Sequence, residues 1–310
     1  MKKANLFIVG HPRSGTSSLH HYLRQHPDVF MTTIKEPNFF NLDFRNESDQ
    51  FHNKRLYFPY RTESQYLRLY QKWKDERIAG EASATYLYSK AAAQAIFQYN
   101  AASKIIIMLR EPVEFLHSFH SAARFALGEH HREFKAAMMA EKDRREGHDF
   151  SKRVIAPSWL LYSEFTKYTE QVQRFSSCFD QEKIKIIIFD DFIKNTPDVY
   201  RNILEFLSID PGFSPEFKVV NPNKQISWPL LKKSTLDSPY FRKTLRWLFS
   251  DDTYAGLKDF YKNKMAKHKP RQPLDATFRR ELMQRFKIEV KKLSVFLNKD
   301  LVAKWGYDNI

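Results

Sequence analysis

The chain has 310 residues, 42% of them hydrophobic, which is enough to bury a substantial core. Lys and Arg total 51 against 36 Asp and Glu, and the net charge of +15 favours polyanionic partners: nucleotide phosphates, acidic polysaccharides, nucleic acids or an anionic membrane surface. The single cysteine, Cys178, excludes an intramolecular disulfide framework and a multi-thiolate metal site, and the lack of an apolar run of about 18 residues excludes a spanning helix.

The first expected element is a short buried strand at residues 6–9. Met1-Lys2-Lys3 is followed by a strand of only about five residues, so no signal peptide is expected and the sequence predicts a cytoplasmic protein. The strand runs into residues 10–18 (GHPRSGTSS), called the glycine loop below, and then into a helical pattern. Loop N–H groups and a helix N-terminus together form a cradle for a phosphate. The two glycines have the Walker A spacing, but Thr16 replaces the expected Lys and the cation lies inside the loop, at Arg13. This departure favours a phosphate-bearing donor other than a hydrolysed nucleoside triphosphate.

Two further buried strands are expected at residues 104–109 and 184–189. Both are β-branched runs without alternation, as is typical of parallel strands covered on both faces. Helical patterns lie between the strands, at residues 19–23, 66–73, 91–99, 113–127 and 159–175. A further helix is expected after the last strand, at 196–207, with Thr196 as its predicted N-cap. The alternation predicts an α/β, P-loop-like three-layer fold: a central parallel sheet flanked by helices, with its ligand at the carboxyl ends of the strands.

We expect a single domain over residues 1–310, with two unusual segments and a last helix at 277–297. Residues 128–153 are charged and have little apolar periodicity, which suggests a mobile helical lid. Residues 221–275 are rich in Pro, Lys and aromatic residues and are candidates for an acceptor groove that also closes over a cofactor. The basic aromatic stretch 240–247 is equally compatible with a membrane contact, or with an amphipathic helix that packs its aromatic side chains inward.

Several of these elements are followed by polar side chains that are candidates for binding or catalysis. They are Lys35-Glu36-Pro37 before Phe39-Phe40, Glu81 within residues 80–87, Arg110 and Ser118 after the second long strand, and Asp190-Asp191 after the third. With these motifs the chain resembles the sulfotransferases that use 3′-phosphoadenosine 5′-phosphosulfate (PAPS), in particular the carbohydrate and heparan-type branch and its bacterial relatives. The glycine loop resembles that family's 5′-phosphosulfate loop, residues 109–118 its 3′-phosphate motif, residues 35–40 the segment with the catalytic glutamate, and residues 297–305 its ending. The resemblance covers essentially the whole chain.

The resemblance implies PAPS as donor, adenosine 3′,5′-bisphosphate as product, and no metal. It assigns the 5′-phosphosulfate to Arg13, Ser14, Gly15, Thr16, Ser17 and Ser18, and the 3′-phosphate to Arg110 and Ser118. Glu36 is the implied general base, and Arg13 also serves catalysis by stabilising charge. Burial beside Phe39 and Phe40 is expected to raise the pKa of Glu36 and make it a better base. Lys35 and His11 are expected near the sulfonate or the acceptor, whereas Glu81 is a candidate second carboxylate for which we favour a structural role.

The expected acceptor is a hydroxyl or amine of a saccharide or glycolipid, with sulfation of a small lipid, polyketide or phenol as the alternative. Ala82 stands where heparan-type enzymes tend to carry Lys, which weakens the case for a strictly heparan-like acceptor geometry. An ATP–Mg²⁺ nucleotide kinase would explain the glycine spacing and Asp190 but not Arg110. A nucleic-acid-binding module would leave the glycine loop unexplained, so no nucleic-acid partner is expected. Adjacent histidines such as His130-His131 cannot chelate from one helix face, and the histidines have no partner carboxylates at ligand spacing, so no metal site is expected.

Overall fold

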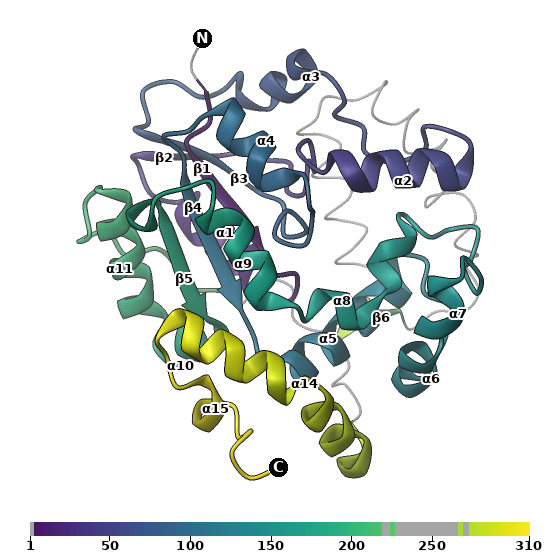
Figure 1. Ribbon diagram of the computed structural model, residues 1–310. Coiled ribbons are helices and arrows are strands. Elements are labelled where there is room, and N and C mark those ends of the chain that lie inside the picture. The colour runs from purple at the N-terminus through teal and green to yellow at the C-terminus, as the bar shows by residue number, and fades with distance from the viewer. Residues whose placement is uncertain (1–2, 219–223, 227–265, 269–272) are drawn as a thin grey trace.

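A sheet of five parallel strands forms the centre of the molecule, in the order β2-β3-β1-β4-β5 (Figure 1). The computed structural model describes residues 3–218, 224–226, 266–268 and 273–310, so most of the 221–275 region lies outside the described residues. The strands are β1 (Leu6–Gly10), β2 (Val29–Met31), β3 (Ile78–Ala82), β4 (Lys104–Leu109) and β5 (Ile184–Ile188). Because β1 lies between β3 and β4, its carboxyl end brings the glycine loop to the middle of one sheet edge.

Length and residue type explain which strands the sequence reveals. β1, β4 and β5 were predicted to within one residue; all of β1 is buried, as is all of β4 except Lys104. β2 and β3 were not predicted as strands, because β2 is only three residues long and β3 reads Ile-Ala-Gly-Glu-Ala. The glycine of β3 has a packing reason, since a Cβ on Gly80 would lie 2.8 Å from the carbonyl oxygen of Leu6 on β1.

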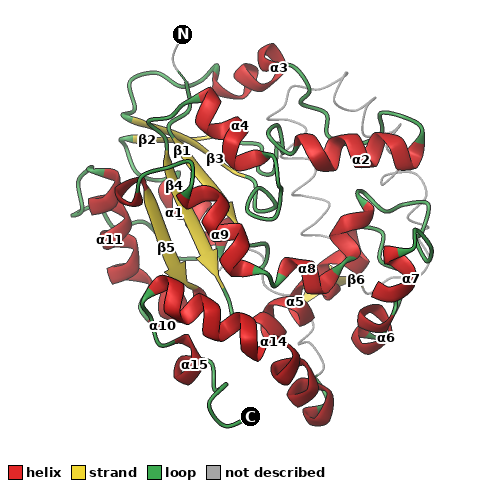
Figure 2. Ribbon diagram, in the orientation of Figure 1, coloured by secondary structure: helices red, strands yellow, loops and turns green. Residues whose placement is uncertain are grey.

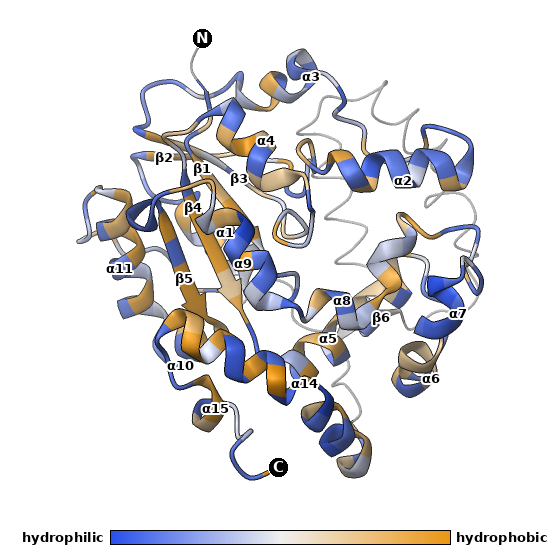
Figure 3. Ribbon diagram, in the orientation of Figure 1, coloured by the Kyte–Doolittle hydropathy of each residue, from blue (hydrophilic) through white to orange (hydrophobic). Residues whose placement is uncertain are grey.

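Helices cover both faces of the sheet and complete the predicted three-layer α/β fold (Figure 2). One face packs against α1 (Thr16–Leu23), α10 (Phe189–Lys194) and α11 (Thr196–Leu207). The other face packs against α4 (Ala92–Tyr99), α5 (Pro112–Ala126), α9 (Tyr168–Ser176) and α14 (Ala276–Leu297). The sheet strands are largely hydrophobic, whereas the helices alternate between hydrophobic and hydrophilic stripes (Figure 3).

Two helical patterns are divided differently from the prediction, and a third helix has a different N-cap. The 159–175 pattern is interrupted at Leu161 and Lys167, whose ψ angles of 80° and 60° leave the helical region; it forms η2 (Pro157–Leu160), α8 (Tyr162–Phe165) and α9. The 66–73 pattern is α3 (Glu63–Leu67), started by a Thr62–Gln65 capping box, followed by the 3₁₀ turn η1 (Arg68–Tyr70). Thr196 is the first residue of α11 and not its N-cap, because the Asn195 side chain caps the helix by accepting from the N–H of Asp198.

The 128–153 segment contains two short helices and an internal buried ion pair, which Tyr162 links to the rest of the molecule. Arg144 donates to both carboxylate oxygens of Glu129, at 2.8 and 2.9 Å, and Tyr162 donates to the same carboxylate at 2.7 Å. A lid that moves stays a prediction. The remaining elements are α2 (Leu42–His52), α6 (Phe134–Met139), α7 (Glu141–Arg145), η3 (Gln181–Lys183), α15 (Leu301–Lys304) and the antiparallel pair β6 (Lys224–Ile226) and β7 (Ala266–His268). Within the described ranges, no helix has both the length and the hydropathy needed to cross a membrane.

Candidate active site

The glycine loop turns sharply between β1 and α1. Arg13 and Gly15 both have positive φ, 62° and 91°, and α1 begins directly afterwards at Thr16. A side chain at Gly15 would approach Met108 and Phe192 to 3.1 Å, so glycine is favoured by both the backbone angle and the available space. As N-cap, Gly15 has no side chain to occupy the first-turn N–H groups, and that turn carries no acidic residue. The start of α1 therefore suits an anion.

Two arginines and a serine meet beside this loop, as their predicted shared ligand requires. Arg13 donates from Nε to the Oγ of Ser118 on α5 at 3.0 Å. Arg110, just after β4, donates from Nη1 to the carbonyl oxygen of Arg13 at 3.2 Å. Its guanidinium also lies over the ring of Phe189, 4.7 Å from the centroid, and 3.5 Å from a carboxylate oxygen of Glu114. The arginine fork is thus fixed at the sheet edge, a position suited to a second phosphate.

Glu36 lies on a loop that follows β2 and is anchored to the segment after β3. Its φ is 61°, its N–H donates to the carbonyl of Ala82 at 2.9 Å, and its Oε2 accepts from the N–H of Ala84 at 2.9 Å. The other oxygen, Oε1, forms an ion pair with Lys35. A Cβ on Gly10 would lie 3.1 Å from the carbonyl oxygen of Ala84, which shows how closely this segment packs against the start of the glycine loop. Glu36 and Lys35 are therefore held near the loop through Ala84.

The expected apolar surroundings of Glu36 are not observed. Phe39 stacks on Tyr66 at a centroid distance of 4.5 Å, and Phe40 packs into the core against the same ring. The Glu36 side chain is 37% exposed and faces the ammonium of Lys35. The expectation that Phe39 and Phe40 would bury this carboxylate is therefore wrong, because the positive φ values at Glu36 and Asn38 turn the chain between them.

Glu81 on β3 is fully buried among hydroxyl groups. Tyr66 donates to Oε1 at 3.0 Å, Tyr86 to Oε1 at 2.8 Å and Ser83 to Oε2 at 2.7 Å. Burial raises the pKa of Glu81 to about 7, although these hydrogen bonds oppose the shift. Ser83 also accepts from the N–H of Asn38 at 3.1 Å, which links Glu81 to the loop of Glu36. These contacts agree with a structural role for Glu81.

His11 is buried beneath the glycine loop. Its Nε2 is 2.6 Å from Oε1 of Gln171, and its ring packs against Phe115 and Tyr168 at 4.8 and 5.0 Å. The Gln171 amide donates to the carbonyls of Glu164 and Phe165, so its oxygen accepts and His11 Nε2 carries the proton. Burial lowers the pKa of His11 to about 4, so the ring is neutral at pH 7. Contact between His11 and an acceptor stays a prediction that this enclosure does not favour.

The structure adds residues that the sequence did not suggest. Gln171, Glu114 and Phe189 fix His11 and Arg110 from other elements, and Arg279 on α14 forms an ion pair with Glu114. Of these contacts, only that of Arg110 with Glu114 could be expected from the sequence, because the two residues have i,i+4 spacing. The other contacts join segments that are distant in the chain. Asp190 accepts from the indole N–H of Trp305 at 3.1 Å and Asp191 pairs with Lys304, so the acidic pair after β5 fixes the C-terminal segment.

Comparisons with known proteins agree with the resemblance to the sulfotransferases. Residues 5–214 match the model of the sulfotransferase family. Carbohydrate sulfotransferase 15 of Homo sapiens is 24% identical over a region that covers 81% of this chain and 54% of that protein. Membrane-associated sulfotransferase kil1 of Dictyostelium discoideum is 26% identical over 110 residues, 36% of this chain and 21% of that protein. The chain thus spans about half or less of the length of these relatives. A sulfotransferase structure from Alicyclobacillus acidocaldarius has the same fold, with a TM-score of 0.69, 24% identity and coverage of 98% of this chain and 99% of that one.

Proposed function

Because this chain belongs to the sulfotransferase family, we propose that it transfers a sulfuryl group from PAPS to a hydroxyl or amine of an acceptor and releases adenosine 3′,5′-bisphosphate. One observation carries the proposal: Arg110 and Ser118 both contact Arg13 of the glycine loop. PAPS has a phosphosulfate at its 5′ end and a separate phosphate at its 3′ position. Two adjacent anion sites at one sheet edge match that pair of groups, whereas a simple nucleoside triphosphate would need only one.

The residues on this edge fit such a donor. The loop residues Arg13, Ser14, Gly15, Thr16, Ser17 and Ser18 would hold the 5′-phosphosulfate, through N–H groups at the start of α1 and the charge of Arg13. Arg110 and Ser118 would hold the 3′-phosphate with a guanidinium fork and a hydroxyl. Both arginines are oriented by hydrogen bonds within the protein, and such preorganisation lowers the cost of binding.

In the proposed reaction the acceptor oxygen or nitrogen forms a bond to the sulfur of PAPS as the bond between sulfur and the bridging phosphate oxygen breaks. Negative charge then develops on the departing phosphate oxygen, and Arg13 with the loop N–H groups stabilises it. Glu36 takes the proton of the acceptor hydroxyl or amine on its carboxylate. The Ala84 N–H, which donates to Oε2, orients this carboxylate, and Lys35 beside Oε1 attracts an anionic group of the donor or acceptor.

We further propose a saccharide or glycolipid as the acceptor. The net charge of +15 suits an acidic glycan, and a relative named carbohydrate sulfotransferase matches 81% of the chain at 24% identity. A Mg²⁺-dependent kinase is disfavoured because Thr16 replaces the loop Lys of the Walker A motif and because a kinase leaves Arg110 unexplained. Screening oligosaccharides, glycolipids, small lipids and phenols with PAPS, with mass spectrometry of the products, tests the acceptor class. Sulfation of phenols or small lipids alone would replace the saccharide proposal.

The donor is tested by calorimetric titration with adenosine 3′,5′-bisphosphate, with ADP and ATP–Mg²⁺ as comparisons. ADP has the adenosine and a 5′-diphosphate but no 3′-phosphate. We expect the bisphosphate to bind more tightly than ADP, and Mg²⁺ to have no effect. Tighter binding of ATP–Mg²⁺ would contradict the sulfotransferase proposal and favour a kinase.

A further inference from the structure

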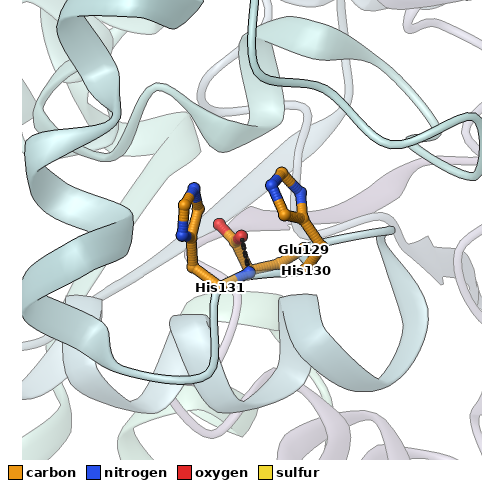
Figure 4. Close-up of side chains that lie close together, drawn as sticks. All are labelled: Glu129, His130 and His131. Carbon is orange, nitrogen blue, oxygen red and sulfur yellow. Dashed lines mark hydrogen bonds between the residues drawn. The ribbon is translucent and has the colours of Figure 1, made fainter.

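A cluster of two histidines and an aspartate lies outside the active site, in the 128–153 segment. His130 and His131 stand between α5 and α6, and Asp149 follows α7. Nε2 of His130 is 2.9 Å from Oδ1 of Asp149, and Nε2 of His131 is 2.7 Å from Oδ2. The two rings lie 4.3 Å apart at an angle of 35° and project to the same side of the chain (Figure 4).

This arrangement removes the objection to chelation by adjacent histidines. The objection assumed a helix, on which successive side chains point in different directions. Residues 128–132 are not helical, because Gly128, with a φ of 88°, lies beyond the end of α5. Both imidazoles can therefore reach one carboxylate.

The buried ion pair of Glu129 and Arg144 supports the cluster through hydrogen bonds. Glu129 accepts from the N–H of His131 at 2.8 Å, and Arg144 Nε donates to the carbonyl oxygen of Asp149 at 3.3 Å. One buried ion pair thus positions both the histidine side and the aspartate side. Such support from surrounding groups is typical of metal sites.

We propose that His130, His131 and Asp149 form a binding site for a divalent transition-metal ion such as Zn²⁺. Two imidazole nitrogens and a carboxylate oxygen are a ligand set that Zn²⁺ accepts, with water as a fourth ligand. Zinc bonds of about 2.0–2.1 Å place tetrahedral ligand atoms about 3.3 Å apart. The observed separations, 2.9 Å from His130 to Oδ1 and 2.7 Å from His131 to Oδ2, are shorter than this and join the two imidazoles to different oxygens of one carboxylate, so the side chains would have to rotate apart to admit an ion.

The charges near the cluster permit a cation. Arg144 lies 3.8 Å from Oδ2 of Asp149, but its charge is neutralised by the two hydrogen bonds to Glu129. Among the described residues, Glu129, His130 and His131 form a group whose possible ligand atoms all lie within 4.8 Å of one another. Both oxygens of Glu129 already accept from Arg144. We therefore assign Glu129 to orienting the two histidines, and Asp149 to the third ligand of the metal ion.

The bound ion would join residues 130–131 to residue 149 and so close the segment that contains α6 and α7. Since the unfolded chain does not hold these three side chains together, binding stabilises the native state. The role is structural, and it is independent of the sulfuryl-transfer proposal because none of the three residues belongs to the anion sites.

Calorimetry of the tag-free full chain with Zn²⁺ and thermal unfolding with and without Zn²⁺ test the site. We expect one ion per chain and, at a 100-fold excess over Kd, a Tm increase of roughly 3–5 °C. The substitutions His131→Ala and Asp149→Asn should each weaken binding more than about 10-fold. Two control variants should leave binding unchanged. His148→Ala removes an exposed neighbouring histidine, and Cys178→Ser removes the lone thiol.

Absorption of the Co²⁺-loaded protein reports the ligand geometry independently of stability. Circular dichroism of each variant shows whether it is folded, and Asp149→Asn keeps the side-chain shape in case His131→Ala unfolds. Failure of the wild-type chain to bind Zn²⁺ overturns the proposal. Binding that survives both His131→Ala and Asp149→Asn also overturns it, because the ion would then lie elsewhere.

Discussion

The Nε of Arg13 donates to the Oγ of Ser118 at 3.0 Å, although the two residues are 105 positions apart in the chain. Arg13 belongs to the loop after β1 and Ser118 to the helix after β4, and these strands are neighbours in the sheet. The contact brings the proposed 5′-phosphosulfate and 3′-phosphate sites to one place. A single ligand that carries both groups can therefore engage both elements.

Replacing Arg110 by Ala should weaken binding of adenosine 3′,5′-bisphosphate by about 10- to 150-fold. This corresponds to about 1.5–3 kcal/mol for a hydrogen bond to a charged group. ADP binding should change much less, because ADP has no 3′-phosphate. Calorimetry with both ligands measures the difference.

Arg124→Ala is the matched control, since Arg124 is exposed on the same α5 that carries Ser118. Arg110→Lys tests the guanidinium fork, because it keeps the charge and loses the planar pair of donors. If Arg110→Ala weakened ADP and the bisphosphate equally, Arg110 would act by supporting the loop through the Arg13 carbonyl, and its assignment to the 3′-phosphate would be wrong.

Glu36→Gln should lower turnover about 10²- to 10⁴-fold, the usual contribution of a general base. The amide oxygen can still accept from the Ala84 N–H, so the loop should stay in place. Binding of adenosine 3′,5′-bisphosphate should therefore be nearly unchanged. Steady-state rates with PAPS and calorimetry on the same variant separate the two effects.

Glu63→Gln removes an exposed carboxylate on α3 and should leave turnover as it is. Full activity of Glu36→Gln would show that another group accepts the proton. Loss of donor binding in that variant would instead indicate that Glu36 supports the anion site.

Gly10→Ala tests the contact that holds the Glu36 segment against the glycine loop. The added Cβ would lie 2.5 Å from the Cβ of Leu87 and 3.1 Å from the carbonyl oxygen of Ala84, so the two segments must separate. Overpacking of this kind costs about 1–3 kcal/mol in the free energy of unfolding. We expect turnover to fall as well, because Ala84 orients Glu36.

Gly147→Ala is the control, since nothing lies within 4 Å of a Cβ built there and only the positive φ of 86° opposes the change. Urea unfolding of both variants gives the comparison. Wild-type stability and turnover of Gly10→Ala would show that the two segments do not pack as closely as described.

The sequence predicted the parts of this fold that depend on local composition. β1, β4 and β5 are apolar runs rich in β-branched residues, and such runs are recognisable without any partner. β3 was hidden because close approach to Leu6 requires Gly80 and because Glu81 looks wrong for a strand interior. The hydroxyls that satisfy Glu81 come from Tyr66 and Tyr86, whose convergence depends on the tertiary fold.

In the candidate site, too, some features were predicted from the sequence and others were not. The glycine loop and Arg110 were found because their positions after strands place them at the carboxyl edge of a parallel sheet. The surroundings of Glu36 were not predicted. A positive φ at Glu36 turns its side chain away from Phe39, and few signals in a sequence reveal such an angle for glutamate. His11 was assigned to the substrate from its place in the loop, whereas its burial depends on Gln171 of α9.

Glu81→Gln should change how the stability of the protein depends on pH. Burial raises the pKa of Glu81 to about 7, above the ordinary value near 4.5 of the unfolded chain. The protonated form is therefore favoured in the native state, and its stabilising contribution is complete below about pH 4.5 and lost as the pH rises through about 7. Glutamine does not titrate, and its amide oxygen can accept from Tyr66 and Tyr86 as the protonated acid does.

The stability of the wild type relative to Glu81→Gln should thus fall between about pH 4.5 and pH 7, by roughly 1.4 kcal/mol for each unit of pKa shift. The variant comparison is needed because His11, whose pKa is lowered to about 4 by burial, acts in the opposite direction: its contribution is present above pH 6.5 and lost as the pH falls through about 4. Urea unfolding at several pH values, with Glu63→Gln as the exposed control, isolates the Glu81 contribution. Parallel curves for the wild type and Glu81→Gln would mean that Glu81 titrates in the folded protein as it does in the unfolded chain.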